Sequence, residues 1–155
     1  MKNKPRVKRF VIDRTVWLRG LDTMPENDDD DDPCSYLLRK CDGLKCCLGI
    51  YLSQCGMSDG QLTGKNLPSA CPRLPEEAEW LTAKLSYTNS SRLTIPASYA
   101  QVEDEFADVN DSRDINEQER ESKVKEMFAA QGIKVSFKGK RLPSRFGKTR
   151  KTKGV

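Results

Sequence analysis

The sequence predicts one small α+β domain, with about four helices around a central cysteine-rich helix and a small sheet that includes the N- and C-terminal strands. An apolar stripe at helical spacing across residues 43–55 predicts the central helix. Two short segments rich in β-branched and aromatic residues, 7–12 and 133–137, predict the strands. A length of 155 residues fits a single domain that can bury about 70% of its unfolded surface.

The central helix has a start signal, an apolar face and a stop signal. We expect Asp42 to cap the first turn, because its side-chain oxygen can accept a free backbone N–H. Gly56 can adopt the left-handed conformation that ends a helix. Small side chains at Cys46, Cys47 and Gly49 would let a neighbouring element pack closely. The apolar face consists of Leu44, Cys47, Leu48, Tyr51, Leu52 and Cys55.

The N-terminal third combines a strand, a turn and an acidic loop. Residues 1–5 are expected to form a disordered leader before the first strand. Asp13 can then cap a short helical turn, with Trp17 as a core anchor. Residues 22–33 form an acidic loop with five consecutive aspartates, Asp28–Asp32. Because adjacent like charges repel, we expect this loop to be solvated and mobile.

Capping signals mark three more helices after the central one. Ser58 and Gln61 have the spacing of a capping box. Pro75 is followed by acidic residues that favour the first turn of a helix, and Asn116 can cap the last helix. The predicted elements are a short helix ending at Gly64, a helix from Pro75 with Leu74, Ala78, Leu81 and Leu85 on its inner face, a strand at 93–95, and helices at 98–109 and 116–132.

Charge is distributed unevenly along the chain. The net charge is +4, but residues 1–12 hold five basic and no acidic residues, and residues 134–155 hold nine basic and no acidic residues. The middle of the chain is therefore strongly acidic. This asymmetry is typical of interaction tails. We assign residues 6–137 to the globular domain and residues 138–155 to a basic disordered tail.

The basic tail is the candidate nucleic-acid-binding segment. Its cations can neutralise phosphates and release counterions, and its one aromatic side chain could stack on a base. A solvated tail, or one that folds back on the acidic loop, remains the alternative. The candidate residues are Lys138, Lys140, Arg141, Arg145, Phe146, Lys148, Arg150, Lys151 and Lys153.

The six cysteines are interpreted mainly as small buried hydrophobic residues. Zinc sites usually pair cysteines with two to four residues between them, and only Cys41 and Cys46, with four residues between them, come near that pattern. We expect Cys47 and Cys55 to be buried and reduced, because both lie on the apolar stripe. The full set is Cys34, Cys41, Cys46, Cys47, Cys55 and Cys71.

Several enzyme classes are disfavoured by the composition. The chain has no histidine, the usual general base at neutral pH. Neither a nucleophile–base pair nor a cofactor-binding loop is recognisable, so we expect a non-enzymatic protein without a cofactor. Membrane spans need about 20 apolar residues, and no such run occurs. With no signal peptide either, the expected location is the cytoplasm, where thiols stay reduced.

A second, weaker candidate site is a calcium loop between the last two predicted helices. Counted from Asp108, oxygen-bearing side chains occupy positions 1, 3, 5, 9 and 12 of a loop of EF-hand length. Asn116 stands at position 9, and Asp114 stands at position 7, where the backbone carbonyl is the ligand. The sixth position should be glycine and is Arg113, and Arg120 stands where an apolar residue is expected. A polar loop between helices is the simpler interpretation. The alternative metal-ligand set is Asp108, Asn110, Ser112, Asp114 and Glu119.

Four motifs resemble a group of short uncharacterised proteins encoded by bacteriophages and bacteria. They are Trp17-Leu18-Arg19-Gly20, Ser35-x-Leu37-Leu38, Asp42-Gly43-x-x-Cys46-Cys47-Leu48-Gly49 and Asn110-Asp111 with Glu119-Arg120-Glu121. The resemblance covers roughly residues 10–137 and carries no catalytic residues over. It implies a phage-borne accessory protein in the host cytoplasm.

The sequence thus leads to three functional hypotheses. The first is a non-enzymatic accessory protein that binds a host or phage macromolecule through its charged surfaces. The second is a nucleic-acid-associated protein anchored by residues 138–155. The third is a calcium- or zinc-binding structural module. A small-molecule substrate and a membrane partner are not indicated.

Overall fold

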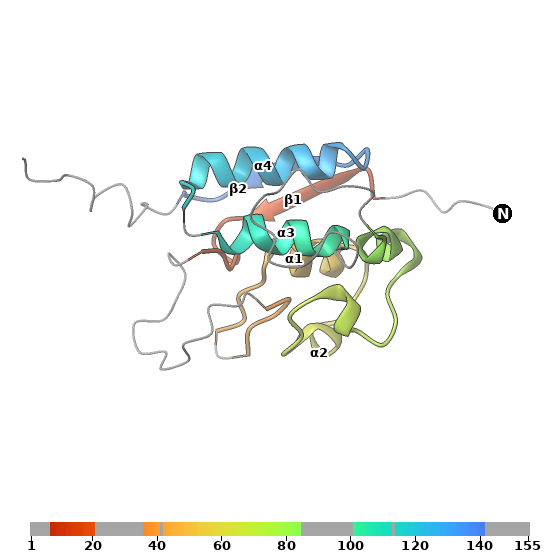
Figure 1. Ribbon diagram of the computed structural model, residues 1–155. Helices are drawn as coiled ribbons and strands as arrows, with labels where there is room; N and C mark the ends of the chain where they lie inside the picture. The colour runs from red at the N-terminus through yellow and green to blue at the C-terminus, as the bar shows by residue number, and fades with distance from the viewer. Residues whose placement is uncertain (1–6, 21–35, 41, 85–100, 113, 142–155) are drawn as a thin grey trace, which may run out of the picture.

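A computed structural model of the chain describes residues 7–20, 36–40, 42–84, 101–112 and 114–141. These residues form one α+β domain, as predicted, in which a two-stranded sheet covers one side of a helical body (Figure 1). The elements, in chain order, are β1 (Arg9–Asp13), α1 (Cys47–Gln54), α2 (Asp59–Leu62), the 3₁₀ helices η1 (Pro68–Ala70) and η2 (Glu76–Thr82), α3 (Val102–Asp111), α4 (Glu117–Ala129) and β2 (Lys134–Lys138).

The sheet joins the two ends of the domain. β1 and β2 pair in parallel, with Arg9 opposite Lys134 and Asp13 opposite Lys138. The predicted pairing of the first and last strands is therefore confirmed, although each strand lies one or two residues later than expected. Because successive side chains alternate across a strand, one face of the sheet is apolar and turns inward. This inner face consists of Phe10, Ile12, Val135 and Phe137.

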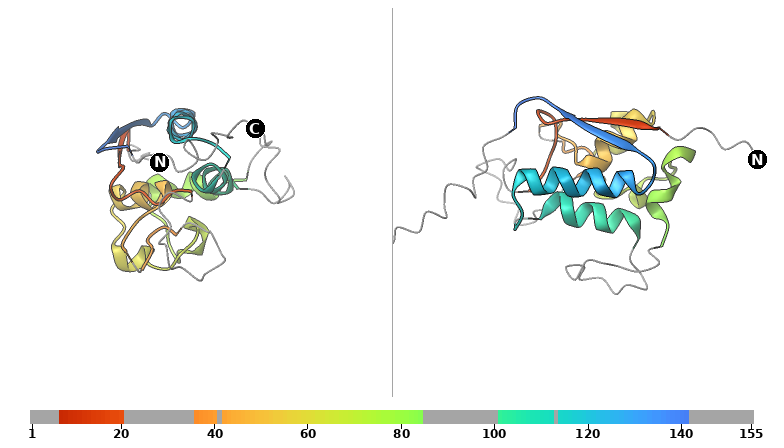
Figure 2. Two further views of the ribbon diagram at one scale, coloured as in Figure 1. Left: turned by 90° about the vertical axis from the view of Figure 1, so that its left-hand side faces the viewer. Right: turned by 90° about the horizontal axis from the view of Figure 1, so that it is seen from above.

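Helices fill the space behind the sheet. α4 packs on β2 and α1 packs on β1, while α3 lies against both helices on the side away from the sheet (Figure 2). α1 is the central helix, as predicted, because residues 47–52 are all buried. Aromatic side chains from every layer meet at the middle of the core. They are Phe10, Tyr51, Trp80, Phe106 and Phe128, with ring centroids 4.7–6.1 Å apart.

The start of the central helix differs from the prediction. α1 begins at Cys47, and its cap is Cys46, whose sulfur accepts the Gly49 N–H at 3.4 Å. Asp42 is not the cap: its carboxylate accepts the Leu44 N–H and pairs with Arg39. The reason is tertiary pairing, since the backbone after Gly43 is held extended by hydrogen bonds from Leu18 N–H to Lys45 and from Cys46 N–H to Tyr36.

Close packing at Gly49 matches the expectation for a small residue there. A Cβ at Gly49 would lie 1.8 Å from the Leu37 carbonyl oxygen, so only glycine fits. The stop signal is also confirmed, because Gly56 has φ +99° after the last helical turn. The segment 36–40 thus lies directly on α1 and fixes its position.

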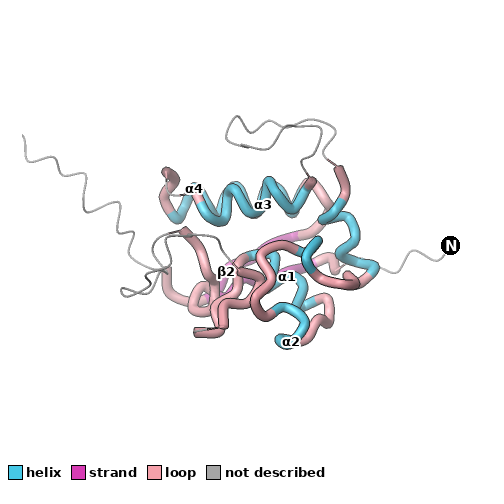
Figure 3. The backbone as a smooth tube through the Cα atoms, turned by 60° about the horizontal axis from the view of Figure 1, so that its bottom comes forward, coloured by secondary structure: helices cyan, strands magenta, loops and turns pink. Residues whose placement is uncertain are grey.

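Loops make up much of the described chain between β1 and α3 (Figure 3). The predicted helical turn after Asp13 is only a turn, and the fully buried Trp17 pairs as an isolated bridge with Lys45. The helix predicted from Pro75 is the 3₁₀ helix η2, with Ala78 and Leu81 buried. The capping box at Ser58 and the cap at Asn116 are confirmed. The acidic loop 22–33, the strand 93–95, Leu85 and residues 98–100 lie outside the described residues.

Candidate functional site

The outer face of the sheet carries a group of exposed cations. Its side chains come from alternate positions of both strands, and Asp13 is the only acidic residue that the two strands contain. Further cations flank the strands at both ends. We call these cations the basic strip, defined by the exposed residues Lys8, Arg9, Lys134, Lys138, Lys140 and Arg141; Arg9, Lys134 and Lys138 lie on the outer face of the strands, and the other three lie in the chain next to the strand ends. An excess of exposed positive charge on one face can attract phosphate groups.

One acidic side chain partly neutralises the strip. Asp13 accepts hydrogen bonds from the Thr15 hydroxyl and backbone N–H at 2.7 and 3.0 Å, and its carboxylate lies 3.7 Å from the Lys138 ammonium. These donors, with a smaller contribution from the Lys138 charge, hold the pKa of Asp13 below its usual value. Asp13 therefore stays ionised at neutral pH and offsets one of the cations.

The start of the basic tail is attached to the domain. Lys138 belongs to β2, and Arg14 donates a hydrogen bond to the Gly139 carbonyl at 2.8 Å. Beyond it, the guanidinium of Arg141 contacts the buried Glu121 carboxylate at 2.8 Å. Arg14 also binds Glu121, through two nitrogens at 2.6 and 3.1 Å. Burial would raise the pKa of Glu121, but the two arginines outweigh it, so the pKa lies below its usual value.

Only part of the predicted tail site is therefore placed. Lys138, Lys140 and Arg141 are exposed on or beside the strip, and the first and last of them have acidic partners in Asp13 and Glu121. The remaining candidates lie outside the described residues. These are Arg145, Phe146, Lys148, Arg150, Lys151 and Lys153.

A buried polar centre lies where the end of α3 meets the start of α4. We define it by Trp17, Arg19, Asn110, Glu117 and Arg120. The side-chain oxygen of Asn110 accepts hydrogen bonds from Trp17 Nε1 at 2.8 Å and from the Cys47 backbone N–H at 3.1 Å. Its amide nitrogen donates to the Leu18 carbonyl at 3.0 Å. Asn110 thus joins three of the four sequence motifs in one hydrogen-bonded unit.

In the polar centre, two arginines share one carboxylate. The Glu117 carboxylate binds both Arg19 and Arg120, and all three residues are at most 3% exposed. Arg120 also donates to the carbonyls of Val109, Asn110 and Ser112 at 2.7–2.8 Å, which satisfies the C-terminal end of α3. This arrangement holds the fold together, since the Glu117 carboxylate and the Arg120 guanidinium bind groups of the protein itself.

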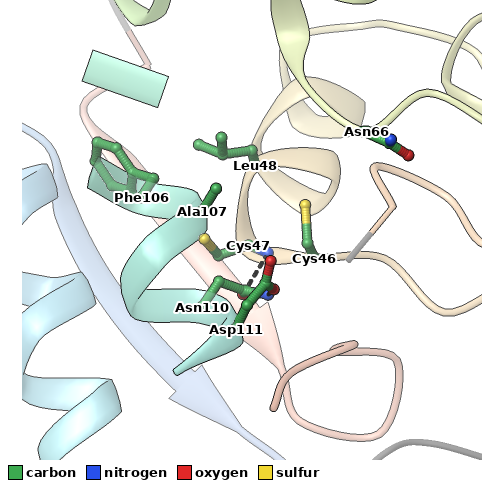
Figure 4. A pocket seen from close by; sticks show the side chains of 8 residues that line it. All are labelled: Cys46, Cys47, Leu48, Asn66, Phe106, Ala107, Asn110 and Asp111. Carbon is green, nitrogen blue, oxygen red and sulfur yellow. Dashed lines mark hydrogen bonds between the residues drawn. The ribbon is translucent and has the colours of Figure 1, made fainter. Parts of the chain in front are cut away.

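A small cavity borders the polar centre. It has a volume of about 10 Å³ and is lined by Cys46, Cys47 and Asn110 among others (Figure 4), which is room for one water molecule. Burial raises the pKa of the Cys46 thiol to about 12, and it raises that of Cys47 well above its usual value. These thiols are therefore protonated at neutral pH and lack the thiolate that nucleophilic chemistry requires.

The cysteines follow the interpretation as hydrophobic residues where they are described. Cys46, Cys47 and Cys71 are buried free thiols, whereas Cys55 is only half-buried. Cys34 and Cys41 lie outside the described residues. Across the described ranges, no group of three histidine, cysteine or acidic side chains is placed to hold a metal ion.

The alternative calcium ligands do not form a chelating loop. Asp108 and Asn110 belong to α3, which continues to Asp111, so the expected start of the loop is helical. Asn110 points into the core instead, and Glu119 lies in α4 beside Lys123, 3.6 Å away. Ser112 and Asp114 follow the helix end. Arg120 of α4 binds the carbonyls at the end of α3, so the two flanking helices pack together.

The sequence gives no local signal that groups Lys8, Arg9 and Lys134 on one side of the sheet, because this grouping depends on the pairing of distant strands. For Asn110 a signal exists, because it lies four residues after Phe106 and therefore on the inner face of the same helix. A polar residue on an apolar stripe is a sign of a buried hydrogen-bonded position.

The helices in the described ranges all fall short of the length and apolar content that a membrane crossing needs. Comparison of the chain with protein-family models, with curated proteins and with solved structures gave no significant match.

Proposed function

We propose that this chain is a non-enzymatic accessory protein that binds nucleic acid through its phosphates, using the basic strip and the tail. The observation that carries the proposal is the excess of exposed cations on the outer face of the sheet, where Asp13 is the only acid within the strands. The resemblance to phage-encoded proteins and the free thiols favour action in the cytoplasm of a bacterial host.

The charge pattern supports a phosphate ligand more than a chemical reaction. Cations on short strands present fixed positive charge, and the tail adds five more in residues 142–155 with no acidic residue. Each phosphate neutralised on duplex DNA releases counterions, so log K falls by about 0.9 per log unit of salt. Binding of this kind is independent of base sequence. It also needs none of the buried thiols or carboxylates of the core.

The test is a salt titration of binding to a labelled 20-base-pair duplex, followed by fluorescence anisotropy. The proteins are the intact chain, a chain ending at Arg141 and the double variant K134Q/K138Q. Ending the chain at Arg141 leaves its contact with Glu121 in place. We expect the truncation to lower the salt slope by up to about 4.5 and the double variant to lower it by about 1.8.

The matched control is K125Q, an exposed lysine on α4, which packs on the inner side of the sheet. It should leave the slope unchanged. Deletion of Asp28–Asp32 should tighten binding, because these aspartates compete for the same cations. Equal binding by all variants would overturn the proposal. Preferential binding of an acidic polypeptide over the duplex would favour a protein partner instead.

A further inference from the structure

We infer that the nucleic acid runs along the strands of the sheet and is held at two separate ends of the basic strip. This inference deepens the proposed function, on which it rests, by giving the direction and the length of the ligand. It is carried by the parallel pairing of β1 and β2 together with the exposure of the flanking cations. We define the first end by Lys8, Arg9 and Lys134, and the second end by Lys138, Lys140 and Arg141.

The parallel pairing separates the two basic ends of the chain. In a parallel pair both strands start at the same end of the sheet, so the start of β1 lies beside the start of β2. Figure 2 shows the described chain beginning at one end of the sheet and leaving β2 at the other. In an antiparallel pair, Lys8 and Arg9 would instead lie beside Lys138, and Lys134 would lie at the opposite end. Lys8 and Arg9, at the start of β1, therefore lie at the opposite end of the sheet from Lys140 and Arg141, which follow β2.

The distance between the two ends selects an extended ligand. Lys134 and Lys138 are four residues apart on one strand, which corresponds to about 13 Å at the rise of a parallel strand. This length matches about four base pairs, because successive pairs are 3.4 Å apart along the helix axis. A single phosphate or a nucleotide is too short to reach both ends. A longer backbone can contact both at once, and only then do the two ends act together.

The outer face between the ends is compatible with a ligand lying on it. The side chains there are Val11, which is 38% exposed, and Ser136, which is also exposed. Both are small and uncharged, so they leave room for a backbone to cross. At the second end, Arg141 is paired with Glu121 in the free protein. If a phosphate draws Arg141 away, Glu121 keeps its two bonds to Arg14.

The experiment compares a short and a long single strand, d(T)3 and d(T)20, on the intact full-length protein and on two matched variants. K8Q/K134Q removes two lysines from the first end, and K138Q/K140Q removes two from the second. All four lysines are exposed, so the fold should be kept, and circular dichroism checks this. Salt titration measures affinity for d(T)20, and NMR titration of backbone amides shows which end d(T)3 contacts.

With d(T)20, each double variant should lower the salt slope by about 1.4, because each phosphate on a single strand contributes about 0.7. A variant that combines all four substitutions should lower it by about 2.8. With d(T)3, the chemical-shift changes of backbone amides should disappear only at the end that carries the substitutions. The other end still binds, so the total affinity should fall by no more than about half. If one pair carries the whole effect on d(T)20, the ligand does not follow the strands and the inference is wrong, although nucleic-acid binding stands. No binding of either strand by the intact protein would overturn both proposals.

Discussion

The polar centre and the basic strip use the same kind of side chain for opposite purposes. In the polar centre, Arg19 and Arg120 are fully or almost fully buried, and both are bound by Glu117. On the strip, Arg9 and Lys134 are exposed. A buried charge must be matched within the protein, because water cannot solvate it. An exposed charge needs no such partner and remains available to a ligand.

This difference separates residues that hold the fold from residues that can bind. Substitution in the polar centre should change the free energy of unfolding and, through it, everything else. Substitution in the strip should change binding and leave stability nearly constant. The comparison fails if the two sets of variants have similar effects on stability.

The largest effect is expected from Glu117→Ala. The change leaves Arg19 and Arg120 buried without their shared carboxylate, and breaking such a pair typically costs about 3–5 kcal/mol. Urea denaturation should show this loss of unfolding free energy. Glu119→Ala, two residues away on the exposed side of α4, is the control and should change stability by less than about 0.5 kcal/mol. Equal stability of the two variants would show that the polar centre is dispensable.

Gly49→Ala should have the next largest effect. The added methyl group would meet the Leu37 carbonyl, so the segment 36–40 must move away from α1. Overpacking of this kind costs about 1–3 kcal/mol or more. Gly60→Ala is the matched control, because a Cβ there meets nothing closer than 4.0 Å. Thermal unfolding should show a lower midpoint for the first variant and an equal or higher midpoint for the second.

A smaller, pH-dependent effect is expected from Glu103→Gln. Glu103 is buried on α3 and accepts the Ser69 N–H at 2.9 Å, and burial raises its pKa. Its ionisation therefore disfavours folding at neutral pH. Glutamine keeps an acceptor without the charge, so the variant should be more stable than the original chain at pH 7.

The sign of that effect can be checked by repeating the denaturation at lower pH. The penalty disappears as pH falls through the raised pKa of Glu103, and below about pH 4.3, the usual value for an unfolded glutamate, none remains. The advantage of Glu103→Gln should shrink accordingly. The exposed Glu126→Gln serves as control. An advantage that is constant from pH 7 to pH 4 would contradict the explanation.

The smallest effect on stability is expected from K134Q/K138Q. Both lysines are exposed, and the pair between Lys138 and Asp13 is solvated at 3.7 Å, so the change in unfolding free energy should stay below about 0.5 kcal/mol. The same protein should show the reduced salt slope predicted above. A loss of several kcal/mol would mean that the strip contributes to the fold.

The sequence predicted those features that depend on local signals. The stripe of the central helix, the caps at Ser58 and Asn116 and the two strands are all properties of neighbouring residues. The predicted start of α1 was wrong because the backbone of Lys45 and Cys46 forms hydrogen bonds with residues distant in the sequence. Tertiary hydrogen bonds outweighed the local preference of Asp42 for a cap.

The sites were harder to predict for a related reason. On α4, the buried stripe begins with Glu117, Arg120 and Glu121 before it turns apolar at Val124. By hydropathy, these charges indicate an exposed surface. Only arginines and backbone carbonyls of other segments make them part of the interior. The basic strip depended in the same way on the direction of strand pairing, which neither strand encodes by itself.

The parallel sheet also has a consequence for how the protein is made. Arg14 and Gly139, which meet at the end of the sheet, are 125 residues apart in the chain. During synthesis at about 5–20 residues per second, β1 leaves the ribosome several seconds or more before β2 exists. Its apolar side chains Phe10 and Ile12 must wait without their partner strand. Such long-range closure slows folding, and for this interval the newly made chain leaves apolar strand residues unpaired for longer than a locally paired domain would.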